Sequence, residues 1–208
     1  MIRNIKLKRG LHQFLPYEFG TLAGLRESTQ DGAQIMMVCC ADHGLAADNI
    51  SFVRPEQCIV IQNMAASVPK YDSGEGGSVL ASLAYGISTE HVQDVIVCGH
   101  LACRIIPHWL KSIVELGKDD PGGSFNRNAR MVVESFYRCR SADERHTLMT
   151  CEHLLFQLEN LRSHPFMRDK LRNGKLRLHG WVVDDNTARV LCFDPKSSQF
   201  VSPERTHC

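Results

Sequence analysis

The chain has 208 residues, enough for one α/β domain and short for two. Its 24 basic and 23 acidic residues leave a net charge of +1, and no basic cluster beyond Lys6–Arg9 indicates a nucleic-acid partner. No stretch approaches the about eighteen apolar residues that a membrane helix needs, and the first residues lack the apolar run of a signal peptide. We therefore expect a soluble, cytoplasmic protein with neither a nucleic-acid nor a membrane partner.

Nine cysteines are many for such a chain, and the number is odd. A disulfide framework is typical of small secreted proteins, whereas this sequence is larger and shows no export signal. In a reduced compartment cysteines serve as buried packing or as metal ligands. Four of them lie in apolar runs and are expected to be inert packing: Cys39, Cys58, Cys98 and Cys192.

The first half of the chain contains three short, continuous apolar runs. They are Gln34–Cys40, Cys58–Gln62 and Asp94–Cys98. Such runs predict strands that are buried on both faces, as in a parallel sheet covered by helices. Between the second and third runs, Gly77–Ile87 has apolar residues at helical spacing, with Ser78 as a plausible N-terminal cap.

The second half is mainly helical before it returns to strands. Helices are predicted over Ile105–Leu116, Phe125–Cys139 and Asp143–Leu161, with an exposed loop at Gly117–Gly123. Lys175–Val183 alternates more, which is typical of an outer strand. It is followed by a turn and by a further run, Arg189–Phe193, which together predict a hairpin. This order of elements predicts a single α/β domain over residues 1–208, with a mainly parallel central sheet flanked by helices.

Two strand ends carry residues that bind metals. The first run ends in Cys40-Ala41-Asp42-His43-Gly44, and the third ends in Cys98-Gly99-His100-Leu101-Ala102-Cys103. Open α/β sheets form their ligand crevices just past the carboxyl ends of their strands. Two thiolates and an imidazole at such a place form a soft site that suits zinc.

These motifs resemble those of the β-class carbonic anhydrases. That family carries Cys-x-Asp-Ser-Arg after its first strand and Gly-His-x-x-Cys-Gly after its third, and the matching stretches here are Cys40–Gly44 and Gly99–Arg104. Residues 59–69, 78–87 and 179–184 resemble further segments of the family, and the similarity runs from about Gln34 to Asp194.

The resemblance implies a fold, a metal and a reaction. It implies a core over residues 34–194, an N-terminal helical arm over residues 1–28 that packs across a partner, and a homodimer or a higher homo-oligomer. Cys40, His100 and Cys103 would hold Zn²⁺. The implied reaction is the reversible hydration of CO2 to bicarbonate by zinc-bound hydroxide, with Asp42 orienting the hydroxide and His43 relaying protons.

The sequence departs from the family pattern at the partner of Asp42. Active members of the family hold this aspartate by a salt bridge to an arginine two residues later, and here that position is Gly44. Without the arginine, Asp42 is either the catalytic acceptor, or a fourth zinc ligand that closes the site, or a plain loop cap. The glycine that follows the second cysteine in the family is Arg104 here, and we hypothesise that its guanidinium reaches Asp42 and replaces the missing arginine.

Three functions follow from this pattern. We expect a carbonate dehydratase, a zinc lyase that acts on CO2 and bicarbonate. The first alternative is a catalytically inactive homologue whose closed or structural zinc site supports an interaction or regulatory role. The second is a hydrolase of carbonyl sulfide or carbon disulfide, because the same activated water could attack either molecule. No residue pattern indicates any cofactor besides the metal.

Overall fold

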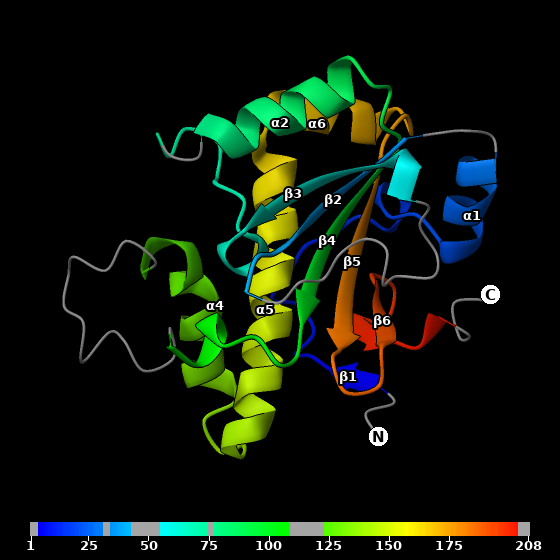
Figure 1. Cartoon of the computed structure of the whole chain (residues 1–208). Coiled ribbons are helices and arrows are strands. Elements are labelled where there is room, and N and C mark those ends of the chain that lie inside the picture. The colour runs from blue at the N-terminus through cyan, green and yellow to red at the C-terminus, as the bar shows by residue number, and fades with distance from the viewer. Residues whose placement is uncertain (1–3, 31–33, 43–54, 75–76, 109–122, 204–208) are drawn as a thin grey trace.

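The computed structural model describes residues 4–30, 34–42, 55–74, 77–108 and 123–203. Within these ranges the strands form one mixed sheet in the order β1-β7-β6-β5-β4-β2-β3 (Figure 1). Their bounds are β1 Asn4–Lys6, β2 Ile35–Cys40, β3 Cys58–Asn63, β4 Asp94–His100, β5 Arg177–Asp184, β6 Arg189–Asp194 and β7 Gln199–Val201.

The half of the sheet formed by β3, β2, β4 and β5 is parallel, whereas β6, β7 and β1 run antiparallel to their neighbours. The mainly parallel sheet and the β5–β6 hairpin are therefore confirmed. All six residues of β2 are buried, as their continuous apolar run predicts. Because β2 and β4 are parallel neighbours with Cys39 opposite Cys98, their carboxyl ends reach the same edge of the sheet.

Two predictions about strand position are wrong. β3 is an edge strand rather than one buried on both faces, and its Val60 is 41% exposed. β5 lies inside the sheet between β4 and β6 rather than at its outside. The alternation that suggested an outer strand comes from Arg177 and His179, whose side chains are held by the buried carboxylate of Asp94.

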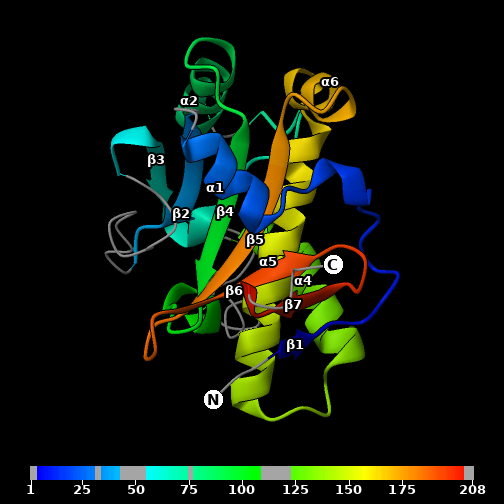
Figure 2. The ribbon, with the colours of Figure 1, turned by 90° about the vertical axis from the view of Figure 1, so that its right-hand side faces the viewer.

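The helices lie on both faces of the sheet. Figure 2 shows α1 in front of the sheet and α5 behind it, and the packing agrees: Leu25 of α1 packs with Met37, while Leu154 of α5 packs with Met36. The bounds are α1 Leu22–Gln30, α2 Gly77–Ser88, α4 Gly123–Phe136, α5 Ala142–Ser163 and α6 Pro165–Arg172. No helix in the described ranges has the length and apolar character needed to cross a membrane.

The predicted helices are found, with one of them only partly described. α2, α4 and α5 match three of the four predicted helices closely. α5 begins at a capping box in which Ser141 and Glu144 bond each other's backbone amides. Residues 105–108 are helical. The rest of the helix predicted over Ile105–Leu116 lies outside the described residues. So does the predicted loop Gly117–Gly123, except for Gly123 itself.

The N-terminal segment packs on its own chain. β1 pairs with β7, and Phe14 contacts Phe193 of β6. Further contacts with α5 come from His12, whose two ring nitrogens lie 2.8 Å from Glu152 and 2.9 Å from Glu159. Contact of this segment with a partner chain stays a prediction.

Candidate metal centre

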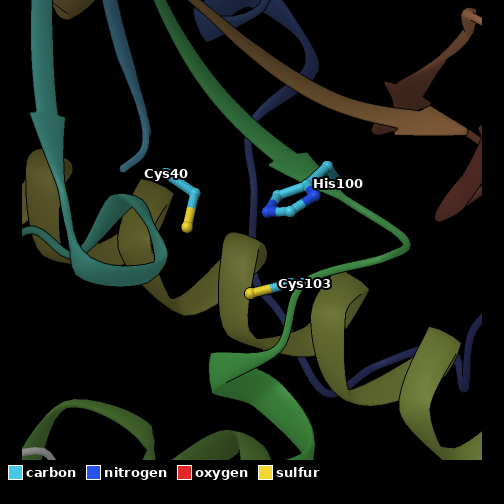
Figure 3. A group of neighbouring side chains, drawn as sticks. All are labelled: Cys40, His100 and Cys103. Carbon is cyan, nitrogen blue, oxygen red and sulfur yellow. The ribbon is translucent and has the colours of Figure 1, made fainter. Parts of the chain in front are cut away.

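Three side chains converge at the carboxyl edge of β2 and β4. Figure 3 shows Cys40 at the end of β2, His100 at the end of β4 and Cys103 in the turn that follows, all directed toward a common point. One ligand atom from each lies within 4.8 Å of the others, and all three residues are buried. The two sulfurs and one imidazole nitrogen form a donor set suited to zinc, close enough for one ion to reach all three.

The alternation of side chains along β2 decides which of its two cysteines can contribute. Cys40 packs with Met36 and Val38 on the face that α5 covers, whereas Cys39 packs with Met37 on the face that α1 covers. Only Cys40 therefore shares a face with Cys103. Cys39, Cys98 and Cys192 are buried on the α1 side of the sheet, away from the three converging side chains. This position fits the predicted packing role.

The imidazole of His100 is oriented by a carboxylate. Its Nδ1 lies 2.9 Å from Oδ1 of Asp185, whose other oxygen accepts the Ala102 amide at 2.7 Å. Because Asp185 engages Nδ1, Nε2 is the nitrogen directed toward Cys40. Burial lowers the pKa of His100, but hydrogen bonds to Cys40 and Asp185 outweigh this and raise it. A carboxylate that fixes the ring of a ligating histidine is a common second partner in zinc sites.

The thiols of Cys40 and Cys103 are expected to differ in acidity. The Cys103 thiol, which donates to Cys40, is the largest cause of a lowered pKa at Cys40; burial opposes it, and His100 and the backbone amides of Asp42 and Ala65 add to it. The pKa of Cys103 is raised by the same pairing and by burial. This pairing favours the thiolate form of Cys40, the form that binds metals.

Asp42 is bonded to Arg104. The guanidinium of Arg104 lies 2.8 Å (Nε) and 2.6 Å (Nη2) from Oδ1 of Asp42, and its backbone amide donates to Oδ2 at 2.7 Å. The hypothesised contact is therefore present. The carboxylate is 8% exposed and the guanidinium 81%. Burial raises the pKa of Asp42, but the bonds from Arg104 outweigh it and lower this pKa.

An apolar cavity lies behind the cluster. Gly99 contributes to it from the end of β4 and Ile106 from the helical residues 105–108, and α5 contributes Thr150, His153 and Leu154. Ala65 and Ala66, in the turn after β3, form the remaining wall together with Val97 and the three converging residues.

Other residues singled out in the sequence have different outcomes. His43 and Gly44 lie outside the described residues. Asp185 was not predicted as a site residue, although it follows the strand beside β4, so the strand-end rule that found Cys40 and His100 would have found it too. His153 is not among the site residues that the sequence predicts; it is buried and lines the cavity.

The comparison with family models settles the relationship. The carbonic anhydrase model matches residues 35–190, most of the chain and all three converging residues. A structure titled as the β-carbonic anhydrase CcaA is 27% identical, with a TM-score of 0.75 over 86% of this chain and 89% of that one. The chain belongs to the β-class carbonic anhydrase family.

Similar proteins extend over most of the molecule. A carbonic anhydrase of Pseudomonas aeruginosa is 29% identical over 180 residues, covering 84% of this chain and 80% of that protein. A carbonic anhydrase of Synechocystis is 27% identical, covering 96% of this chain and 74% of that protein. The Coccomyxa β-carbonic anhydrase in complex with acetazolamide shares the fold at 21% identity, with a TM-score of 0.60 over 79% of this chain and 75% of that one. The β-carbonic anhydrase fold is thereby confirmed.

Proposed function

We propose that this chain is a zinc-dependent carbonic anhydrase that catalyses the reversible hydration of CO2 to bicarbonate. Cys40, His100 and Cys103 hold the zinc in this proposal. Their buried, converging arrangement supports it, as does membership of the family. Asp185 fixes the ring of His100 so that Nε2 is directed toward the metal.

The observation that carries the proposal is the pairing of Asp42 with Arg104. Two oxygens of one carboxylate accept three donors of a single arginine, namely Nε, Nη2 and the backbone amide. A carboxylate held in this way is kept from turning inward as a fourth ligand, so one position on the metal stays open. An open position distinguishes catalytic zinc sites from structural ones.

Each residue of the site has a separate role in this proposal. Bound zinc would supply a Lewis acid that lowers the pKa of a coordinated water toward about 7. Asp42 accepts a hydrogen bond from the reacting water and orients it, while Arg104 holds Asp42. The apolar walls formed by Val97, Ile106 and Leu154 suit an uncharged substrate such as CO2. We also propose that His43 relays protons to solvent.

We further propose that the chain acts as a homodimer or a higher homo-oligomer. Two β-carbonic anhydrases of Sordaria macrospora are described as tetrameric, and one shares this fold with a TM-score of 0.64 at 19% identity. Size-exclusion chromatography with light scattering would measure the mass, and a monomer of 23.4 kDa would contradict the proposal.

Stopped-flow measurement of CO2 hydration tests the function. The purified protein is loaded with zinc, its metal content is measured, and Cys40→Ala is the blank. We expect about one zinc per chain and a hydration rate well above the blank. A protein that binds one zinc and hydrates CO2 no faster than the blank would instead be an inactive homologue. Carbonyl sulfide and carbon disulfide are offered in parallel, and turnover of either without CO2 hydration would move the proposal to a hydrolase.

A further inference from the structure

A strained corner of the backbone lies beside Cys40. Ala65 and Ala66 both have a φ of 57°, in the left-handed region that residues other than glycine rarely adopt. They lie in the short turn Met64–Ala66 after β3, are nearly inaccessible and line the cavity behind Cys40. Two consecutive alanines keep this conformation only where the surroundings impose it.

His153 of α5 supplies one of those constraints. Its Nε2 lies 3.0 Å from the carbonyl oxygen of Ala65, so Nε2 carries the proton and donates it. Its Nδ1 is 3.4 Å from the side-chain amide of Gln157, which fixes the ring from the other side. His153 is 3% exposed, and burial lowers its pKa to about 4, so the ring is neutral and has one proton to donate.

The same face of α5 holds the chain beyond the corner. Gln157 accepts the Val68 amide at 2.8 Å, and Asn160 donates to the Val68 carbonyl at 2.8 Å. His164, the C-cap residue just after α5, donates to the Pro69 carbonyl at 2.9 Å. These side chains follow His153 at spacings of four, three and four residues, the spacing of one helix face. We call them, with His153, the polar stripe of α5.

Ala65 links this stripe to the candidate ligand. While its carbonyl accepts from His153, its backbone amide lowers the pKa of the Cys40 thiol, which lines the same cavity. The Cys40 sulfur also accepts the Asp42 amide at 3.4 Å. The φ and ψ angles of Ala65 fix the direction of its backbone amide relative to its carbonyl. A change of the left-handed conformation at Ala65 would therefore reorient the amide.

We propose that His153 is a positioning residue of the metal centre, which holds the Ala65 carbonyl, fixes the left-handed corner and so directs the Ala65 amide at the Cys40 sulfur. The inference rests on the proposed function in that Cys40 is a metal ligand. It makes His153 part of the outer support of the site, alongside the carboxylate of Asp185.

The polar stripe provides a matched control. His164 is also buried, at 2% exposure, and also donates Nε2 to a carbonyl, but its acceptor is Pro69, four residues beyond Ala65. Loss of His164 removes the same kind of bond without touching the corner. Two amide substitutions at position 153 test whether the hydrogen bond to Ala65 is what matters. His153→Gln places a donor near the position of the original Nε2. His153→Asn is one carbon shorter, so its amide does not reach the Ala65 carbonyl.

The experiment measures zinc dissociation constants by competition with a chromophoric chelator for wild type, Cys40→Ala, His153→Leu, His153→Asn, His153→Gln and His164→Leu. We expect His153→Leu and His153→Asn to weaken zinc binding about 10- to 100-fold, and His153→Gln to stay within about threefold of wild type. His164→Leu should lower the melting temperature without changing zinc affinity. In cobalt-loaded protein, His153→Asn should also shift the thiolate-to-cobalt absorption band.

Each outcome decides a different point. If wild type and Cys40→Ala bind zinc equally, the proposed metal site fails, whatever His153 does. If wild type binds zinc through Cys40 and His153→Asn retains full affinity, the positioning role is wrong. Equal weakening by His153→Asn and His164→Leu would reduce His153 to a general packing residue. If His153→Leu does not fold, the comparison of His153→Asn with His153→Gln still tests the positioning role of His153.

Discussion

Asp42, beside the candidate metal centre, is held by a guanidinium from a different loop than the family pattern provides. The family pattern places an arginine two residues after this aspartate, and the chain has Gly44 there. Arg104, in the turn that carries Cys103, reaches the same carboxylate. The contact was foreseeable because one arginine was lost and one gained at strand ends that meet at one edge of the sheet. The distances and the donor atoms of this contact could be known only from the structure.

The carboxylate of Asp185 gives a second prediction for a single residue. In Asp185→Asn, the uncharged amide no longer stabilises the orientation of His100, and the bond to the Ala102 amide weakens. We expect zinc affinity to fall about 10- to 100-fold, measured by chelator competition. Asp184→Asn is the control, because the carboxylate of Asp184 bonds only the turn residues Asn186 and Thr187 among the contacts found in the described ranges. Equal affinities in the two variants would contradict the role of Asp185.

The cysteines should differ sharply in reactivity. Burial raises the pKa of Cys39 to about 11 and of Cys58 and Cys192 to about 12, and it also raises that of Cys98. Cys139 is exposed. Since the thiolate is the reactive form, we expect native protein treated with iodoacetamide at neutral pH to be alkylated at Cys139 while those four stay unmodified.

Peptide mass spectrometry would read the modified positions, with denatured protein as the control in which all cysteines react. Rapid alkylation of Cys98 or Cys192 in the native protein would show that the α1 face of the sheet is not closed as described.

At the scale of elements, α5 is the support of the site. Its polar stripe holds the segment from Ala65 to Pro69. The sequence predicted α5 as a helix, but not this role. Periodicity identifies which residues a helix buries, whereas the partners of buried polar residues depend on segments far away in sequence.

The N-terminal segment is attached to α5 through a charged histidine. Burial lowers the pKa of His12, but its bonds to Glu152 and Glu159 outweigh this and raise the pKa to about 9. A histidine whose pKa is raised on folding contributes stability that is full below its ordinary value near 6.5 and is lost as the pH rises through 9. We expect the free energy of unfolding to fall by up to about 3 kcal/mol between pH 6.5 and pH 9.5.

Urea unfolding at a series of pH values would measure this loss. His12→Gln is the control, because glutamine fills a similar volume and does not titrate, so its stability should depend less on pH over the same range. Parallel pH profiles for wild type and His12→Gln would show that His12 does not carry the effect.

The interior position of β5 rests on a buried ion pair. Asp94, which is fully buried, accepts from both Arg177 and His179. Removing the carboxylate leaves the Arg177 charge without its partner, so Asp94→Ala should lower the free energy of unfolding by about 3–5 kcal/mol in urea titration. Glu90→Ala removes a carboxylate whose bond to Tyr85 is exposed to solvent, and is a control that should change the free energy of unfolding little. A loss below 1 kcal/mol in Asp94→Ala would contradict this account of β5.

At the scale of the whole molecule, much of the fold followed from the sequence. Continuous apolar runs located β2, β3 and β4, and the strand-end rule brought Cys40, His100 and Cys103 to one edge. The position of each strand in the sheet did not follow. β3 and β2 have similar apolar runs, and only the strand order shows that β3 is an edge strand. β5 was predicted as an outer strand because its sequence contains polar residues, and these are neutralised by Asp94 inside the sheet. The three-residue strands β1 and β7 were too short to give a periodic signal.

The central claim is that Arg104 replaces the family arginine in holding Asp42, and the CO2 hydration rate of zinc-loaded variants tests it most directly. We predict that Arg104→Ala loses about 10- to 100-fold in rate with zinc retained, and that Gly44→Arg in the same chain restores most of it. Arg140→Ala, which removes an exposed arginine paired with Glu144, should match wild type. An Arg104→Ala protein that hydrates CO2 as fast as wild type would contradict the claim.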